Sequence, residues 1–206
     1  MKTQITKEVG LLVSKLAFEV PTWSNVHYML IDLANKVRAS GFKPDILVGI
    51  SRGGWLPTRV LSDLLENPCI TSVGAEFYVG VYETNREPTL TQPLSVSVSN
   101  KNILLVDDVV DTGKSAIMVK NHLDQEGAGD TRILTIYYKP WSIVVPDFYA
   151  KETSDWIVFP WEIKETLRKL AEKYKDKTEL LAEAKLRLIE AGISKQLIER
   201  FMNELP

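Results

Sequence analysis

One stretch of the chain, residues 102–115, constrains the fold more than any other. It reads Asn-Ile-Leu-Leu-Val-Asp-Asp-Val-Val-Asp-Thr-Gly-Lys-Ser, so a continuous apolar run leads into three carboxylates and then a Gly-Lys-Ser step. Such an apolar run is typical of a strand that is buried on both faces of a parallel sheet. Ligands of parallel sheets bind beyond the carboxyl ends of the strands. We therefore expect an α/β fold with a binding site that begins at Asp107.

The end of this stretch has the features of a phosphate-binding loop. Thr112, Gly113, Lys114 and Ser115 stand where a helix through residues 118–123 would begin, so their backbone N–H groups lack partners within the helix. These N–H groups and the positive end of the helix dipole attract an anion. Gly113 lets the backbone approach that anion closely, and the hydroxyl groups of Thr112 and Ser115 supply further donors.

Two acids just before this loop indicate that the ligand is more than a phosphate. Asp107 and Asp108 would repel a phosphate, so they must contact a vicinal diol, a metal ion or a developing positive charge. A sugar phosphate satisfies both demands. Gly-Lys-Ser also ends the Walker A loop, but that motif requires a glycine where this chain has Asp108.

The run Val-Asp-Asp-Val-Val-Asp-Thr-Gly-Lys-Ser resembles the phosphoribosyl diphosphate (PRPP) signature of type I phosphoribosyltransferases. In that family the adjacent acids hold the ribose 2′ and 3′ hydroxyl groups, and the Asp-Thr-Gly-x-Ser/Thr loop binds the 5′-phosphate. By this resemblance, Asp107 and Asp108 would contact the ribose, and residues 111–115 would bind the phosphate. The implied fold is a mostly parallel twisted sheet flanked by helices, with a small hood and a C-terminal helical extension.

A second strand is predicted at residues 46–50, followed by Ser51-Arg52-Gly53-Gly54 and a helical pattern. Such a turn can hold an anion, with Arg52 making bidentate contacts to phosphate oxygens. On its own the motif fits a plain βα turn with a solvated arginine better, since such turns are common. Gly-Ile-Ser-Arg-Gly-Gly, however, resembles the pyrophosphate-binding loop of xanthine-guanine phosphoribosyltransferases. By that resemblance Ser51, Arg52 and Gly53 bind pyrophosphate, and the Ser51–Arg52 peptide is a candidate for a non-proline cis bond.

A third segment, residues 80–99, is polar and follows a strand-like run at residues 70–79. So long a connection in a compact domain is either a disordered linker or a functional lid. We interpret it as a lid, because type I phosphoribosyltransferases close a loop of this position over the reaction. Asn85-Arg86-Glu87 resembles the segment that brings an arginine to the pyrophosphate, which makes Arg86 a catalytic candidate. The alternative for Arg86 is an exposed loop charge.

The base-binding end is predicted from Lys139 and residues 155–162. The latter read Asp-Trp-Ile-Val-Phe-Pro-Trp-Glu, and core packing is the usual fate of such tryptophans. The segment also resembles the xanthine-guanine branch of the 6-oxopurine phosphoribosyltransferases. In that family an aromatic residue stacks on the purine, the next residue's backbone contacts the ring edge, and a lysine at an earlier strand end donates to O6. Trp156, Ile157 and Lys139 take these parts. A Val-Phe pair replaces more polar residues of that branch, which leaves the base preference open.

Composition places the chain among ordinary globular proteins. Its 206 residues suit an α/β core with an appendage, and 45% hydrophobic residues with a net charge of -2 provide no basic field for nucleic acid. Cys69 is the single cysteine, so no intrachain disulfide is expected. The apolar run near the N-terminus is too short for a secretory signal or a membrane span. We therefore expect a cytoplasmic protein without membrane or nucleic-acid partners.

The last part of the chain differs in composition from the rest. From residue 162 to 204, lysine, glutamate, leucine and alanine recur at helical spacing, which predicts two or three helices that pack on the core or form a subunit contact. The expected division is a phosphoribosyltransferase core with hood elements at residues 1–160 and a helical extension at residues 161–206. We also expect a homo-oligomer, either a dimer or a tetramer.

Together these features predict a purine-salvage enzyme that converts PRPP and a 6-oxopurine base into pyrophosphate and a nucleoside monophosphate such as GMP or IMP. Mg²⁺ would bridge pyrophosphate and ribose oxygens, near Asp108 and Asp107. Asp111 resembles the acid/base of the family that faces N7 of the purine, so the catalytic candidates are Asp111, Arg52 and Arg86. Two alternatives stay open, namely a non-catalytic regulator that binds nucleotide or RNA, and a phosphoribosyltransferase for another base.

Overall fold

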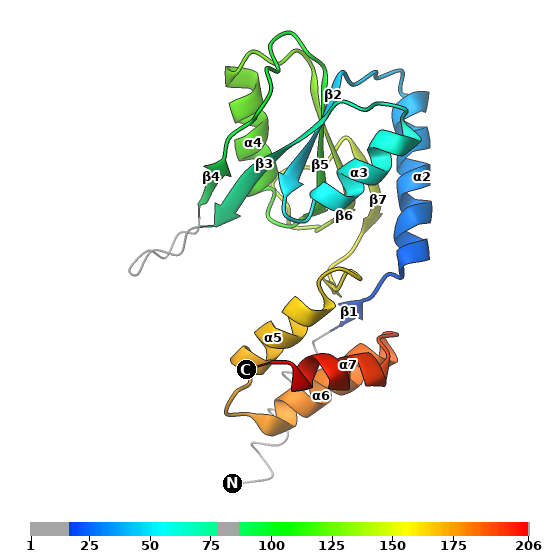
Figure 1. Cartoon of the computed structure of the whole chain (residues 1–206), viewed down its shortest axis with the longest axis vertical. Helices are drawn as coiled ribbons and strands as arrows, with labels where there is room; N and C mark the ends of the chain where they lie inside the picture. The colour runs from blue at the N-terminus through cyan, green and yellow to red at the C-terminus, as the bar shows by residue number, and fades with distance from the viewer. Residues whose placement is uncertain (1–16, 78–86, 206) are drawn as a thin grey trace. The chain divides into compact units, whose positions relative to one another are not determined.

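The computed structural model describes residues 17–77 and 87–205 (Figure 1). Contacts between residues divide the chain into two compact units. The described residues within 26–154 form the larger unit, and residues 17–25 together with residues 155–205 form the smaller one. The expected division at residue 160 stays a prediction.

The larger unit is built on a six-stranded sheet. In the order in which they lie side by side, its strands are β4 (Pro88–Gln92), β3 (Ile70–Phe77), β2 (Ile46–Ser51), β5 (Ile103–Val110), β6 (Thr131–Tyr138) and β7 (Phe148–Glu152). Neighbouring strands are parallel except β3 and β4, which are antiparallel. The helices beside the sheet are α2 (Trp23–Ala39), α3 (Trp55–Leu64) and α4 (Lys114–Gln125). The predicted mostly parallel sheet flanked by helices is confirmed.

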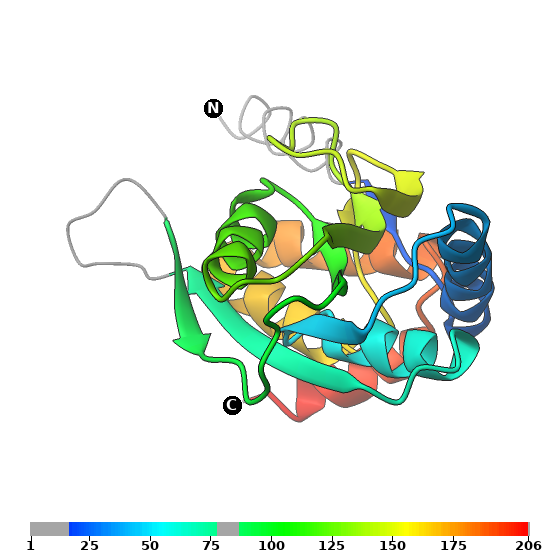
Figure 2. The ribbon, with the colours of Figure 1, turned by 90° about the horizontal axis from the view of Figure 1, so that it is seen from above.

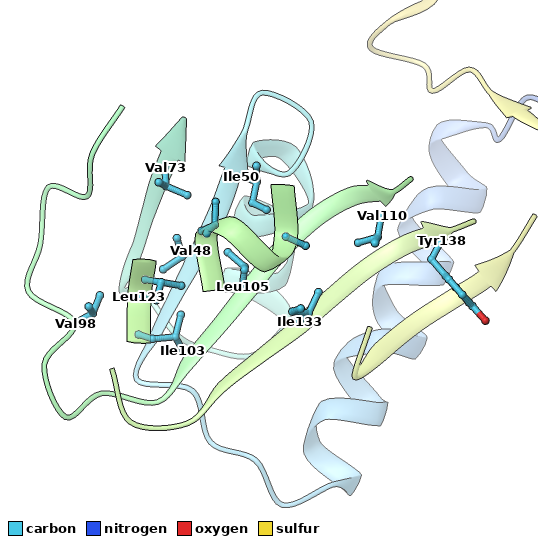
Figure 3. Close-up of a cluster of buried hydrophobic side chains, with 12 residues drawn as sticks. Val48, Ile50, Val73, Val98, Ile103, Leu105, Val110, Leu123, Ile133 and Tyr138 are labelled. Carbon is cyan, nitrogen blue, oxygen red and sulfur yellow. The ribbon is translucent and has the colours of Figure 1, made fainter. Parts of the chain in front are cut away.

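The central strand β5 is buried on both faces, as its continuous apolar sequence predicts. Ile103 and Leu105 join a cluster of apolar side chains that includes Leu123 of α4 (Figure 3). Leu104 and Val106 alternate with them along the strand, so they point to the opposite face. All four side chains on the strand are fully buried. Each buried side chain of this size contributes about 1.5–3 kcal/mol to folding.

The opposite face of the sheet is covered by α3. A Cβ placed on Gly49 of β2 would lie 2.6 Å from Oγ1 of Thr58 in α3, so position 49 faces that helix. Its neighbours Val48 and Ile50 belong to the cluster that includes α4 residues, so they face the other way. Figure 2 shows α3 (cyan) and α4 (green) on the two sides of the sheet. Both helices begin at the edge of the sheet where β2 and β5 end.

The two edge strands are not predicted by the sequence. β4 lies within the polar segment at residues 80–99 and pairs with β3, so this segment is not one continuous loop. Pro88 and Pro93 argue against a central strand, but proline is tolerated at a sheet edge, where one side of the backbone needs no partner. β7 has only five residues, Phe-Tyr-Ala-Lys-Glu, without a clear alternation of apolar and polar side chains.

The smaller unit contains a two-stranded parallel sheet and three helices. Its elements are β1 (Phe18–Glu19), β8 (Trp156–Ile157), α5 (Ile163–Lys173), α6 (Thr178–Glu190) and α7 (Lys195–Asn203). The predicted C-terminal helices are therefore confirmed. Leu167, Leu188 and Ile198 each come from a different helix and share one buried apolar cluster. Among the residues that the structure describes, no helix has the length and apolar character needed to cross a membrane.

Candidate active site

A pocket opens at the carboxyl ends of β2 and β5, beside the start of α4. The residues that line it are Ile50, Ser51, Arg52, Ala75, Asp107, Val109, Val110, Asp111, Thr112, Gly113, Ser115 and Ala116. Because β2 and β5 are neighbouring parallel strands, their carboxyl ends meet at one edge of the sheet. The two segments predicted to bind anions thus contribute to one pocket.

The predicted phosphate loop has a backbone conformation that favours its glycine. Gly113 directly precedes α4 with a φ of 83°, which lies in the left-handed region. A Cβ at this position would also lie 2.7 Å from Oγ of Ser142 and 2.8 Å from Cγ1 of Val144. In addition, the backbone N–H of Ile143 donates to the carbonyl oxygen of Thr112 at 3.0 Å. The loop after β6 therefore packs against the phosphate loop and fixes its shape.

The loop after β2 brings Arg52 to the same pocket. The Ser51–Arg52 peptide bond is cis, as the resemblance implied. The N–H of Gly54 donates to the carbonyl oxygen of Ile50 at 2.8 Å. A Cβ on Gly54 would lie 2.3 Å from the carbonyl oxygen of Val106, so a larger residue would push this loop away from β5. The glycine therefore keeps the arginine-bearing loop next to the acids of β5.

Three predicted residues, Gly53, Asp108 and Lys114, stand beside the pocket lining. The backbone of Gly53 packs against the carboxylate of Asp108. Lys114 is the first residue of α4, and its ammonium group pairs with Glu87 at 2.5 Å. Solvent-exposed pairs of this kind contribute about 0–1 kcal/mol. The backbone N–H of Lys114 lies within the phosphate loop and donates to Oγ1 of Thr112 at 3.4 Å, while its side chain interacts at the surface.

The two adjacent acids repel one another. The N–H of Asp108 donates to Oδ1 of Asp107 at 3.0 Å, and the N–H of Val109 donates to Oδ1 of Asp108 at 2.8 Å. Burial of Asp107 and the charge of Asp108 raise the pKa of Asp107 well above its ordinary value. A ligand that brings hydroxyl donors or a cation would relieve both effects. Ribose hydroxyl groups and Mg²⁺ each meet that requirement.

The donor set at this pair suits Mg²⁺ bound together with a substrate. Within residues 17–77 and 87–205, no three His, Cys, Asp or Glu side chains gather in a way that would hold a metal by themselves. Mg²⁺ commonly binds through one or two carboxylates, substrate phosphates and several waters. Asp107 and Asp108 would therefore hold the ion jointly with oxygens of the substrate.

Asp111 and Lys139, both expected to face the base, are connected by a residue that sequence reasoning missed. Oδ1 of Asp111 accepts a hydrogen bond from Nε1 of Trp141 at 2.8 Å. The ammonium group of Lys139 lies 5.5 Å from the centre of the Trp141 ring, and this lysine is only 6% exposed. The sequence signal for Trp141 is no more than one aromatic residue after Lys-Pro, which matches no motif.

The other base-binding candidates, Trp156 and Ile157, lie in β8 of the smaller unit. Trp156 is 53% exposed, whereas Ile157 is buried. The nearby Trp161 stacks on Phe159 with ring centres 4.5 Å apart, so packing accounts for this tryptophan. Trp156 has the exposed ring that stacking on a ligand requires, and the roles of Trp156 and Ile157 stay predictions. Arg86 lies outside the described residues.

Comparison with known proteins identifies the family. A family model described as "Phosphoribosyl transferase domain" matches residues 22–166, and the chain belongs to this family. A xanthine-guanine phosphoribosyltransferase of Gluconobacter oxydans is 30% identical over 118 residues, which cover 56% of this chain and 67% of the relative. The enzyme of the same name from Cereibacter sphaeroides is 27% identical over 172 residues, or 79% of this chain and 93% of the relative.

Solved structures agree with this assignment. A purine phosphoribosyltransferase from Pyrococcus horikoshii has a TM-score of 0.64 and 35% sequence identity, and the match covers 71% of this chain and 95% of that chain. A Helicobacter pylori xanthine-guanine-hypoxanthine phosphoribosyltransferase has a TM-score of 0.63 at 21% identity, covering 74% of this chain and 98% of that one. The second likeness concerns the fold alone. The expected homo-oligomer stays a prediction.

Proposed function

We propose that this protein transfers the phosphoribosyl group of PRPP to N9 of a 6-oxopurine, which is guanine, hypoxanthine or xanthine. The products are the nucleoside 5′-monophosphate and pyrophosphate. The observation that carries the proposal is a single pocket lined by Arg52, by Asp107 and by four residues of the phosphate loop, namely Asp111, Thr112, Gly113 and Ser115. The relatives, which are xanthine-guanine and purine phosphoribosyltransferases, support the same chemistry.

In this proposal the ribose 5-phosphate moiety spans the acids and the phosphate loop. The N–H groups around Gly113 and the hydroxyl groups of Thr112 and Ser115 bind the 5′-phosphate. Asp107 and Asp108 accept hydrogen bonds from the 2′ and 3′ hydroxyl groups. The raised pKa of Asp107 supports this role, because hydroxyl donors stabilise a carboxylate that burial and a like charge disfavour.

The reaction breaks the bond between the anomeric carbon and a pyrophosphate oxygen, so positive charge develops on the ribose and negative charge on the leaving group. In this proposal Asp107 and Asp108 face the ribose, where their negative charge would stabilise the oxocarbenium character. Arg52 faces the leaving group, where its guanidinium would offer paired donors to pyrophosphate. When bound, Mg²⁺ neutralises part of the charge on the pyrophosphate oxygens. Arg86 is a further candidate for the leaving-group side.

The purine must lose a ring proton as N9 bonds to the ribose, and Asp111 is our candidate for the group that receives it on the N7 side. Asp111 lines the pocket, which supports this role. Lys139 is proposed to donate to O6 of the base, and its position at the end of β6, next to the strand of the acids, supports that assignment. Trp156 would stack on the ring and the backbone of Ile157 would contact its edge.

Pyrophosphate release tests the proposal. The protein is incubated with Mg²⁺, PRPP and one base at a time, and an Asp111→Ala variant purified in the same way controls for a contaminating enzyme. We expect the wild-type protein to release pyrophosphate with at least one 6-oxopurine, and the Asp111→Ala variant to release it much more slowly. Turnover of adenine or a pyrimidine alone would instead define a phosphoribosyltransferase for another base. No release with any base, combined with nucleotide binding, would identify a non-catalytic regulator.

A further inference from the structure

We propose that Trp141 is a positioning residue for the transfer reaction, because one side chain contacts both groups that face the base. Its indole N–H holds one oxygen of the Asp111 carboxylate, and its ring lies beside the ammonium group of Lys139. This inference rests on the proposed function, since it concerns the same site. Trp141 itself transfers no proton and forms no bond to the substrate.

The hydrogen bond to Asp111 restricts how its carboxylate turns. The distance from Nε1 of Trp141 to Oδ1 of Asp111 is 2.8 Å, which lies within the normal range of an N–H···O hydrogen bond. A carboxylate has two oxygens, so a donor on Oδ1 orients the group and leaves Oδ2 to serve as the base. Orientation matters here, because a general base must lie within hydrogen-bonding reach of the proton that it removes.

The contact to Lys139 acts on the second group. Lys139 is almost fully buried, and a buried ammonium group must be held by partners that compensate for lost water. Its Nζ lies 5.5 Å from the centre of the Trp141 ring, within the range of a cation–π interaction. Such an interaction is worth about 0.5–2 kcal/mol, depending on how well water is excluded. The indole therefore restrains the lysine that is proposed to recognise O6.

The backbone around Trp141 is held to the site on both sides. The N–H of Ser142 donates to the carbonyl oxygen of Lys139 at 2.9 Å, and the N–H of Ile143 donates to that of Thr112 at 3.0 Å. These bonds tie the loop to the end of β6 and to the phosphate loop. Trp141 is nevertheless 54% exposed, so burial of its ring does not explain why a tryptophan stands here. The hydrogen bond from its indole N–H to Asp111 does explain it.

Nuclear magnetic resonance tests the contact without any substrate. The chain has five tryptophans, so five indole N–H signals are expected in a ¹H–¹⁵N spectrum of the full-length protein. A Trp141→Phe variant assigns the signal of Trp141. The Asp111→Asn variant should shift that signal and leave the signal of Trp23, whose ring packs on that of Trp161, in place. An unmoved Trp141 signal would overturn the proposal.

Kinetics then test the consequence. Trp141→Phe keeps an aromatic ring beside Lys139 but removes the donor to Asp111. We expect its kcat to fall by about tenfold. A positioned general base accelerates a reaction by roughly 100- to 10,000-fold, and the variant should lose a part of that acceleration. The KM for PRPP should stay within about twofold, because the donor does not act on PRPP binding. Val145→Ala, in the same loop and exposed, is the matched control and should keep the wild-type kcat.

A double-mutant cycle separates positioning from a general loss of structure. In an Asp111→Ala background, Trp141→Phe has no carboxylate to orient, so it should lower kcat no further. The same tenfold loss in both backgrounds would overturn the proposal. If the wild-type protein releases no pyrophosphate with any base, that result would refute the proposed function instead. The Trp141 signal would still decide whether the indole binds Asp111, because it needs no turnover.

Discussion

A Cβ placed on Gly53 would lie 2.3 Å from both carboxylate oxygens of Asp108, a distance that real Cβ atoms essentially never show. Gly53 comes from the loop after β2, whereas Asp108 belongs to β5. The absence of a side chain at one position is therefore what lets the arginine-bearing loop and the acidic strand end share one pocket. The same relationship makes the site sensitive to a single methyl group.

Gly53→Ala should weaken PRPP binding while the fold persists. The new methyl must displace either Asp108 or the loop that carries Arg52, and overpacking of this kind costs about 1–3 kcal/mol. Because each 1.4 kcal/mol is about a tenfold change in affinity, we expect the Kd for PRPP to rise by about tenfold. Calorimetric titration with PRPP and Mg²⁺ measures it. Gly129→Ala is the control, since its methyl meets no atom closer than 3.3 Å and lies away from the pocket.

Asp107→Asn should raise the melting temperature of the ligand-free protein at neutral pH. Burial and the charge of Asp108 raise the pKa of Asp107, so the folded state disfavours its ionised form. That destabilisation is absent below the unfolded pKa of 3.8, grows as the pH rises toward the folded-state pKa and is constant above it. The gain of the variant should therefore shrink toward acid pH. Thermal unfolding by circular dichroism at several pH values tests this.

The outcome of Asp107→Asn is informative because stability and activity should change in opposite directions. The amide keeps the shape of the side chain but lacks the charge that stabilises a developing oxocarbenium ion. Glu126→Gln, which removes an exposed acid just after the end of α4, should change neither property. A melting temperature that falls in Asp107→Asn at neutral pH would contradict the assigned cause of the pKa shift.

The parts of the fold that the sequence predicts are those governed by local patterns. β2 and the first half of β5 are continuous apolar runs because both faces of the sheet are covered, and such runs are visible in the chain. β6 is rich in β-branched and aromatic residues, which favour strands. Gly113 marks the start of α4 because its left-handed backbone favours a residue without a Cβ. β4 and β7 escape prediction because edge strands bury less apolar surface and so show weaker patterns.

The contacts that complete the site are not predictable in this way. Gly53 meets Asp108, and Trp141 meets Asp111, across long intervals of the chain. Neither pair leaves a periodic or motif signal, because tertiary packing alone brings its members together. The motif around Asp107 predicts the residues that are proposed to bind substrate. Trp141, which supports Asp111, becomes visible only once the loop after β6 is seen to pack against the phosphate loop.

Asp111→Ala should reduce turnover by at least about tenfold while PRPP binding persists. A positioned general base supplies roughly 100- to 10,000-fold, and part of that is retained when water takes its place. PRPP binding is proposed to depend on the backbone N–H groups and hydroxyl groups of residues 112–115 and on Arg52, which the variant keeps. Measuring kcat for one base together with the Kd for PRPP separates the two effects. Unchanged turnover would remove Asp111 from the mechanism, and Asp124→Ala, an exposed acid of α4, is the control.

Leu188→Ala in α6 should destabilise the smaller unit strongly, whereas Leu186→Ala in the same helix should not. Leu188 is fully buried in the apolar cluster of α5, α6 and α7, while Leu186 is 49% exposed. Truncating a buried leucine costs about 2–5 kcal/mol through lost burial and the cavity that remains. The exposed one should change the free energy of unfolding by no more than about 0.5 kcal/mol. Because both variants replace leucine by alanine in one helix, the change in helix propensity cancels between them. Urea denaturation followed by circular dichroism compares them, and equal losses would mean that the three helices are not packed around Leu188.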